Sequence, residues 1–366
     1  MASAQQQEHG LGHPSTWPEV VSSMNGFPFP ELISARDVIV PRPGATTDPD
    51  LVVLPDGRTF YLQQRRLADS LFGSVHHGII GSCSNPENPA SFLMPVRPQD
   101  QVHVAVKRSS LARMRRFPQE NVFREISVMR YLAEGGGGHP HVITLVEACM
   151  SASHLYVVIP FYSGGDLLKR VVPNEGTGEP NAVKWFRQIL LGLAYVHSKG
   201  LCHHDFSPEN AMIDARGDAA VVIDFGMVTR MEVVPPGDVV PKRDRAPFGK
   251  FRYMAPEIYQ NDEYDGRQID IWSVGVTLMT CLLGDYAWAA PTRLPVQSRG
   301  IYSSDIFSYT VLEQHGAEVV LERLNLTSRV SAAAVEVLCE MLVIDRHLRP
   351  TSAQLLAEHR FFTAPL

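Results

Sequence analysis

The sequence predicts an α+β fold in two parts, because its hydrophobic period changes along the 366 residues. Alternation typical of strands begins near residue 58 and returns in "VHVAVK", residues 102–107, and in "HLYVVIPF", residues 154–161. From about residue 181 the apolar residues recur at helical spacing instead. Strands gathered in one part and helices in the other favour two lobes rather than a doubly wound sheet.

The strand-rich part also contains one expected helix and one expected insertion. Val122, Ile126 and Met129 recur at spacings of four and three, which places them on one helical face, and the pattern stops at glycines 135–138. Four prolines in the segment 81–101 exclude a continuous strand there. We therefore expect a long excursion between two strands.

The other regions follow from composition and periodicity. Residues 1–57 carry prolines at no fixed interval and are expected to form a flexible, Pro-rich extension. One domain is expected over 58–362, with its first lobe at about 58–161 and its second at about 162–362. In the second lobe, a helix ending at Gly200 is predicted by a single apolar stripe, formed by Val183, Phe186, Leu190 and Leu193.

Composition and charge exclude several functional classes. The chain is 45% hydrophobic and 20% charged, as in ordinary globular proteins, and its net charge of -6 provides no basic excess for nucleic acid. Its five cysteines are widely spread without C-x-x-C spacing, so we expect reduced thiols and an intracellular, cytoplasmic location. The most apolar window is too short to span a bilayer and contains Asp270, so no membrane insertion is expected.

Two short motifs bring oxygen ligands and a base close together in the sequence. "HHDFSPEN", residues 203–210, and "IDFG", residues 223–226, contain Asp205, Asn210 and Asp224. Carboxylate and amide oxygens suit Mg²⁺ that is bound together with phosphates. Asp205 is then a candidate acceptor for a hydroxyl proton.

These motifs belong to a longer series that resembles the eukaryotic protein kinases, from about residue 60 to Phe362. The series is specific because its members occur in the order that the family has. Its members are "LFGSVHHG", "VAVK", "REISVM", "HPHVITLVE", "HHDFSPEN", "DFG", "APE", "DIWSVGV" and "RHLRPT". The resemblance implies that "HPHVITLVE" forms a strand.

The resemblance implies a bilobal kinase fold that uses ATP and Mg²⁺ and acts on a protein substrate. In it Lys107 would hold the ATP phosphates and pair with Glu125, Asp205 would be the catalytic base, and Asn210 and Asp224 would bind the metal.

The same resemblance implies a nucleotide site and one structural pair. Ile159 would be the gatekeeper and the Tyr162 backbone the hinge, while Asp166 stands at a ribose-binding position or caps a helix. Arg349 would pair with Glu257 of "APE". The ATP-binding residues would be Leu67, Gly73, Val75, Ala105, Lys107, Ile159, Tyr162, Asp166 and Met212.

The chain departs from the family pattern in two regulatory places. The Gly-rich loop has Ala68 and Ser70 at the first two glycine positions and keeps only Gly73, which restricts backbone approach to phosphates. His204 replaces an arginine that in many kinases pairs with a phosphate on the activation loop. That loop offers only Thr229 as a Ser or Thr acceptor, so we expect activity that does not depend on activation-loop phosphorylation. A basic cluster in the loop, Lys242, Arg243 and Arg245, is expected to be a solvated stretch or a docking site for an acidic partner.

A third departure concerns the catalytic loop itself. Ser207 stands at the family's lysine position, and Lys250 stands at a threonine position ahead of "APE". We therefore hypothesise that Lys250 projects back beside Asp205 and supplies the missing ammonium, and that Ser207 takes the smaller hydrogen-bonding role. Solvent exposure or recognition of an acidic substrate is the alternative for Lys250.

The resulting interpretation is an active Ser/Thr protein kinase. The altered Gly-rich loop and Ser207 keep open a pseudokinase that acts as a nucleotide-binding scaffold. A small-molecule phosphotransferase of the same fold is disfavoured by "APE", "DIWSVGV" and Arg349. A tyrosine kinase is disfavoured because "PEN", residues 208–210, resembles the Ser/Thr group.

Overall fold

The computed structural model describes most of the chain beyond residue 50, and it divides into two compact units. One unit takes in the chain up to Glu134 together with Thr144–Phe161, and the other takes in Gly135–Ile143 and everything from Tyr162. The described residues are 51–53, 58–83, 92–93, 97–116, 122–134, 136, 138–151, 153–234, 238–239, 249–260, 262–286 and 309–363.

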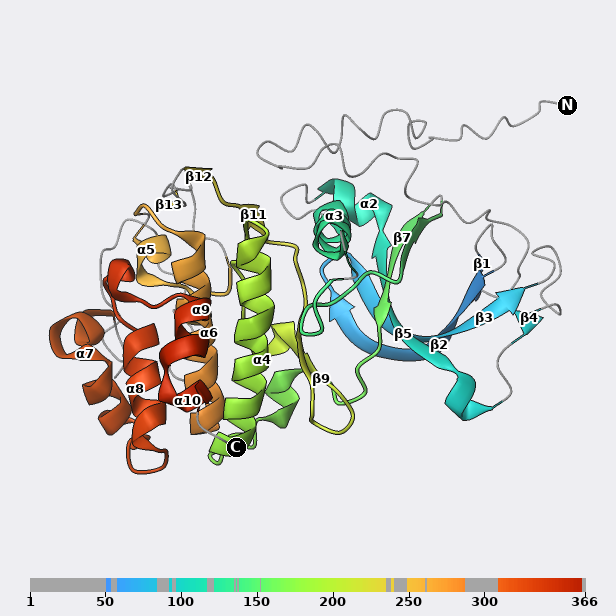
Figure 1. The fold of residues 1–366 in the computed structure, drawn as a ribbon. Helices are drawn as coiled ribbons and strands as arrows, with labels where there is room; N and C mark the ends of the chain where they lie inside the picture. The colour runs from blue at the N-terminus through green and yellow to red at the C-terminus, as the bar shows by residue number, and fades with distance from the viewer. Residues whose placement is uncertain are drawn as a thin grey trace, which may run out of the picture. The chain divides into compact units, whose positions relative to one another are not determined.

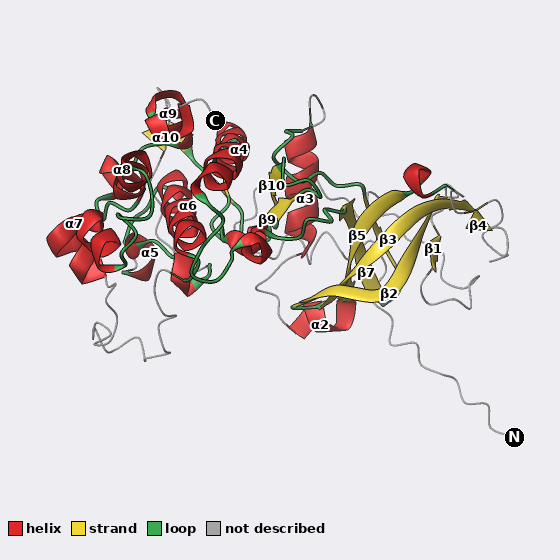
Figure 2. Ribbon diagram, turned by 90° about the horizontal axis from the view of Figure 1, so that it is seen from below, coloured by secondary structure: helices red, strands yellow, loops and turns green. Residues whose placement is uncertain are grey.

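The first unit is built on an antiparallel sheet with the strand order β1-β2-β3-β5-β7-β6, and β4 pairs with β3 (Figures 1 and 2). β1 lies inside the segment 1–57 that is expected to be a Pro-rich extension. The rest of 1–57 lies outside the described residues. The strands are β1 (Leu51–Val53), β2 (Arg58–Ser70), β3 (Gly73–Cys83), β4 (Phe92–Leu93), β5 (Val102–Ser110), β6 (Glu147–Met150) and β7 (His154–Pro160).

Two helices accompany this sheet, α2 (Leu111–Arg116) and α3 (Val122–Ala133) (Figure 1). The predicted apolar face of α3 is confirmed, because Val122, Ile126 and Met129 are all buried. Within the expected insertion, 81–83 continue β3 and 92–93 form β4, while 84–91 and 94–96 lie outside the described residues. A 3-10 turn at Pro98–Asp100 precedes β5.

The second unit is mostly helical and packs around α6, whose side chains are almost all buried. α4 contacts α6, α9 and α10, and it buries Phe186, Leu190 and Leu193 of the predicted stripe (Figure 1). The helices are α4 (Glu179–Ser198), α5 (Pro256–Tyr259), α6 (Gly266–Leu283), α7 (Tyr309–Arg323), α8 (Ala332–Met341), α9 (Ser352–Glu358) and α10 (Arg360–Thr363), with 3-10 turns at Leu167–Arg170, Pro208–Asn210, Phe251–Tyr253 and Arg346–Leu348.

Short two-stranded sheets in the second unit carry its polar loops. β8 pairs with β11, β9 with β10, and β12 with β13. The strand expected over "HPHVITLVE" was misplaced: β6 begins only at Glu147, and Val142 makes one isolated bridge with Val222. The paired strands of the second unit are β8 (Leu201–Cys202), β9 (Ala211–Ile213), β10 (Ala220–Val222), β11 (Thr229–Arg230), β12 (Val233–Val234) and β13 (Asp238–Val239).

A β-sheet unit and a helical unit together confirm the α+β prediction. No helix among the described residues is both long and apolar enough to cross a membrane.

Candidate active site

The loop between β8 and β9 presents Asp205 with both carboxylate oxygens oriented. The backbone N–H of Lys250 donates to Oδ1 at 3.0 Å, and Asn210 Nδ2 donates to Oδ2 at 3.3 Å. Asn210 Nδ2 also donates to the Asp205 carbonyl oxygen at 2.6 Å. Because its nitrogen is used in this way, the side-chain oxygen is the atom that Asn210 can offer to a cation.

Burial raises the pKa of Asp205 above its ordinary value, and the nearby Asp224 carboxylate raises it further. The charges of Lys250 and His203 and the Lys250 N–H act in the opposite direction. A carboxylate with a raised pKa is better matched to taking up a proton near neutral pH. Asp205 thus has the electrostatic setting of a general base.

Asp224 follows β10 in a backbone conformation that few residues adopt. Its φ is 64°, in the left-handed region, and its Oδ1 accepts a hydrogen bond from Gly226 N at 3.3 Å. Ile223 N donates to the Asn210 carbonyl at 3.0 Å, which ties the two polar segments together. Such a conformation costs about 1–3 kcal/mol and clusters at functional sites. Asn210 and Asp224 therefore offer the hard oxygen donors that Mg²⁺ prefers, and the charge of Asp224 is close enough to raise the pKa of Asp205.

Lys250 contacts the catalytic loop through its side chain as well as its backbone. Its Nζ donates to Ser207 Oγ at 2.5 Å and lies 3.6 Å from Glu209 Oε2. Ser207 is completely buried. Sequence reasoning expected the Lys250 side chain to project back beside Asp205. Its backbone amide is bonded to Asp205 and its ammonium to Ser207, and that ammonium is close enough to lower the Asp205 pKa.

A glycine makes this approach of Lys250 possible. Gly249 has a φ of 82°, and a Cβ placed there would lie 2.8 Å from the His204 carbonyl oxygen. Only a residue without a side chain allows the two segments to approach so closely at that backbone angle.

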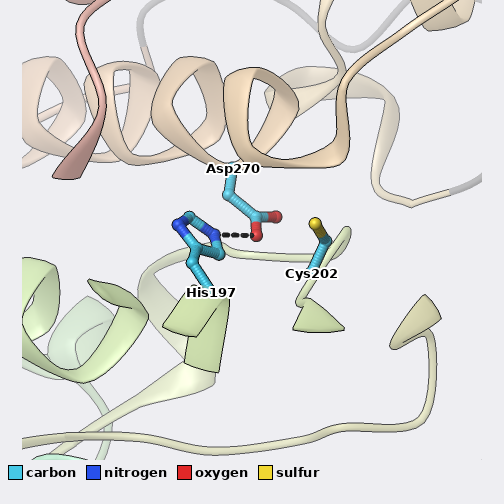
Figure 3. A group of neighbouring side chains, drawn as sticks. All are labelled: His197, Cys202 and Asp270. Atoms are coloured by element: carbon cyan, nitrogen blue, oxygen red, sulfur yellow. Dashed lines mark hydrogen bonds and ion pairs between the residues drawn. The ribbon is translucent and has the colours of Figure 1, made fainter. Parts of the chain in front are cut away.

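A buried carboxylate, Asp270 of α6, holds the backbone just before Asp205. Its Oδ1 accepts the His204 N–H at 2.7 Å, and its Oδ2 accepts the His203 N–H at 2.8 Å. Figure 3 shows the His197 ring turned toward the same carboxylate, where Nε2 lies 2.9 Å from Oδ2. The hydrogen bond from His197 and the charges of the nearby histidines hold the pKa of Asp270 below its ordinary value, although complete burial acts to raise it. In the sequence, Asp270 stood out as a charge inside an apolar window and as the first residue of "DIWSVGV", but neither feature assigned it this contact.

Asp270, His197 and Cys202 bring three metal-ligand atoms within 4.8 Å of one another (Figure 3). A metal ion there would compete with the backbone N–H groups that already occupy both Asp270 oxygens. We therefore interpret this group as a support for the catalytic loop.

His204 and Thr229, which the sequence singled out, lie near each other. Thr229 begins β11, and its Oγ1 lies 3.5 Å from His204 Nε2. His204 is buried and has a φ of 67°. The basic cluster expected at 242–245 lies outside the described residues.

In the first unit, Lys107 of β5 reaches Glu125 of α3. Lys107 Nζ donates to Glu125 Oε2 at 2.6 Å, and the Glu125 side chain is only 8% exposed. Lys107 pairs in register with Val75 and Val157, so it stands in the middle of the sheet. The ion pair implied by the sequence is present.

The other residues that the sequence predicts to bind nucleotide are distributed over the two units, each described by itself. Ala105 pairs with Ile159 across β5 and β7, and Leu67 lies where the register of β2 and β3 shifts. Gly73 packs so tightly that a Cβ would lie 2.0 Å from the Arg108 carbonyl oxygen. In the second unit the backbones of Asp166 and Met212 form an isolated antiparallel β-bridge. Tyr162 accepts the Gly165 N–H at 3.1 Å through its carbonyl.

Asp166 caps the turn Leu167–Arg170 in this structure. Its Oδ1 accepts the Lys169 N–H at 3.1 Å, and its Oδ2 lies 2.7 Å from Lys169 Nζ. The capping interpretation of Asp166 is therefore confirmed.

The predicted partner of Glu257 is also confirmed. Arg349 forms a two-pronged ion pair with the Glu257 carboxylate at 2.6 and 2.9 Å, and both residues are buried. Arg349 donates further to the carbonyls of Val343, Ile344 and Gln268, so its charge is fully hydrogen-bonded.

Comparison with known proteins agrees with these features. The family model of the protein kinase domain matches residues 91–362, nearly three quarters of the chain. The chain belongs to the protein kinase family.

Its similar relatives include plant enzymes. It is 34% identical over 173 residues to "Serine/threonine-protein kinase SAPK3" of Oryza sativa, which covers 47% of this chain and 48% of that protein. It is 34% identical over 206 residues to "CBL-interacting serine/threonine-protein kinase 24" of Arabidopsis thaliana. That alignment covers 56% of this chain and 43% of the relative. It is 34% identical over 173 residues to "Serine/threonine-protein kinase SRK2G" of Arabidopsis thaliana. That alignment covers 47% of this chain and 46% of the relative. The chain thus aligns with about half the length of these relatives or less.

Proposed function

We propose that this chain is an ATP-dependent protein serine/threonine kinase. The observation that carries the proposal is the oriented carboxylate of Asp205, with Asn210 and Lys250 bonded to it and Asp224 near enough to raise its pKa. Membership of the protein kinase family and the names of the relatives support the same activity. We propose that the catalytic domain spans 58–362, since β2 and β3 belong to the same sheet as the later strands.

The residues then divide the reaction among them. Asp205 accepts the proton of a substrate serine or threonine hydroxyl while that oxygen forms a bond to the γ-phosphorus of ATP, and the bond to ADP breaks. Lys107, held by Glu125, contacts the ATP phosphates. Asn210 and Asp224 would hold Mg²⁺, which when bound neutralises phosphate charge. Most of the catalysis in such a reaction is positioning and electrostatic stabilisation.

Lys250 supplies positive charge in place of the lysine that Ser207 replaces. An ammonium has three donors, and Ser207 takes one of them at 2.5 Å. The Ser207 hydroxyl fixes the ammonium in place, so Lys250 can donate to the transferring phosphoryl group.

The test is transfer of radiolabel from [γ-³²P]ATP with Mg²⁺ to a Ser/Thr peptide array by the full chain. Asp205→Asn, Asp224→Asn and Lys107→Met should each abolish incorporation. Asp218→Asn is the matched control, because the Asp218 side chain is 67% exposed. Its one ion pair in the described structure is a loose one, with Oδ1 3.6 Å from Lys184 Nζ. Equal incorporation by wild type and Asp224→Asn would refute the proposal. Nucleotide binding without transfer by wild type would favour a scaffold instead.

A further inference from the structure

Two histidines of neighbouring strands lie on one face of the sheet in the first unit. His77 of β3 pairs in register with Ala105, and His103 of β5 pairs with Ile79. The two histidines are therefore diagonal neighbours across an antiparallel pair, a relation that long side chains can bridge. His76, the next residue in β3, must point to the opposite face.

The two imidazoles are held with one nitrogen of each facing the other. His77 Nε2 lies 3.0 Å from His103 Nδ1, and the rings are stacked at 5.0 Å with an angle of 12°. The Phe161 ring packs against His77 at 4.4 Å, and Phe161 N donates to the His103 carbonyl at 3.3 Å. Both histidines are thus restrained before any ligand arrives.

This spacing matches the needs of a late transition metal. Such ions bind imidazole nitrogen at about 2.0–2.1 Å. Two imidazole nitrogens on one ion are then about 3 Å apart at the right angle of a tetragonal site, and slightly farther apart at a tetrahedral angle, which is close to the observed separation. His103 is exposed, so water can reach the remaining coordination positions.

We propose that His77 and His103 together bind a divalent late transition-metal ion, such as Zn²⁺ or Cu²⁺, with water as the remaining ligands. The ion binds both facing nitrogens from one side of the line that joins them, and the proton that one of them carries moves to the other nitrogen of its ring. No net proton is released when both rings begin neutral. The site differs in ligand chemistry from the oxygen donors of Asn210 and Asp224, because imidazole suits Zn²⁺ and Cu²⁺ whereas Mg²⁺ prefers oxygen.

The bound ion would join β3 to β5, the strands that carry Val75, Ala105 and Lys107. Because it binds the folded sheet and not the separated strands, it should stabilise the chain against heat. The site does not depend on the proposed kinase activity, and its test requires no turnover.

The experiment is a titration of the full chain with ZnCl₂ and separately with CuCl₂, at about pH 7.5, followed by thermal unfolding and by calorimetry. Wild type should show saturable binding and a rise in Tm that MgCl₂ does not reproduce. His77→Gln and His103→Gln should each weaken this binding at least tenfold. His76→Gln, which removes a histidine from the opposite face of the same strand, should leave it unchanged.

A spectroscopic measurement on wild type covers the case in which a variant fails to fold. The electron paramagnetic resonance spectrum with one equivalent of Cu²⁺ should show coupling to two imidazole nitrogens. Equal zinc affinity in wild type, His77→Gln and His103→Gln, or a Cu²⁺ spectrum without nitrogen coupling, would overturn the proposal.

Discussion

Replacing Lys250 with alanine isolates the charge of its side chain, because the backbone N–H that donates to Asp205 Oδ1 is kept. The base should therefore stay oriented while the ammonium that contacts Ser207 is lost. One charge-assisted hydrogen bond contributes about 1.5–3 kcal/mol. If that contact is made to the transferring phosphoryl group, kcat should fall roughly tenfold to a hundredfold.

The assay is steady-state peptide phosphorylation, combined with ATP affinity measured by calorimetry. ATP affinity should change little, since the contact is made in the transition state rather than in the ground state. Lys184→Ala is the matched control, because it removes another lysine of the second unit that lies 3.6 Å from the exposed Asp218 carboxylate.

The double change Ser207→Lys with Lys250→Thr should recover much of the lost rate, because the ammonium then comes from the other segment. An unchanged kcat in Lys250→Ala would refute the reasoning, and so would a loss explained entirely by weaker ATP binding.

Three further predictions concern stability and regulation. Asp270→Asn leaves one acceptor oxygen for the donors that now share two, so chemical denaturation should show a loss of about 3 kcal/mol or more at neutral pH. Because the folded pKa of Asp270 is depressed, its stabilisation is complete above about pH 4 and is lost as pH falls through the folded pKa; the stability difference between wild type and variant should shrink there. Gly73→Ala would place a Cβ 2.0 Å from the Arg108 carbonyl oxygen, so Tm should fall and the KM for ATP should rise, whereas Ser70→Ala should change both little. Thr229→Ala and phosphatase-treated wild type should both retain most of the kinase rate, and a large fall in both would contradict independence from activation-loop phosphorylation.

Much of the proposed site can be predicted from the sequence because its residues stand in short segments with fixed neighbours. Asp205 and Asn210 share one loop, and Asp224 begins a turn, so local order alone assigns their chemistry. The same is true of the buried face of α3, since helical periodicity specifies which residues turn inward. Other expectations were less accurate: the strand that the family resemblance implied over 139–147 begins only at Glu147, and β1 lies in a segment that composition assigned to an extension.

Contacts that depend on register and on the approach of distant segments required the tertiary structure. Nothing local in the sequence pairs His77 with His103, because their meeting depends on the alignment of β3 with β5. Asp270 reaches the backbone of His203 and His204 only because α6 packs beneath the catalytic loop. The contact of Lys250 with Ser207 likewise spans 43 residues and depends on the left-handed turn at Gly249. Sequence determined which chemical groups are available, whereas packing decided which of them meet, because distances between remote segments are set by the whole fold.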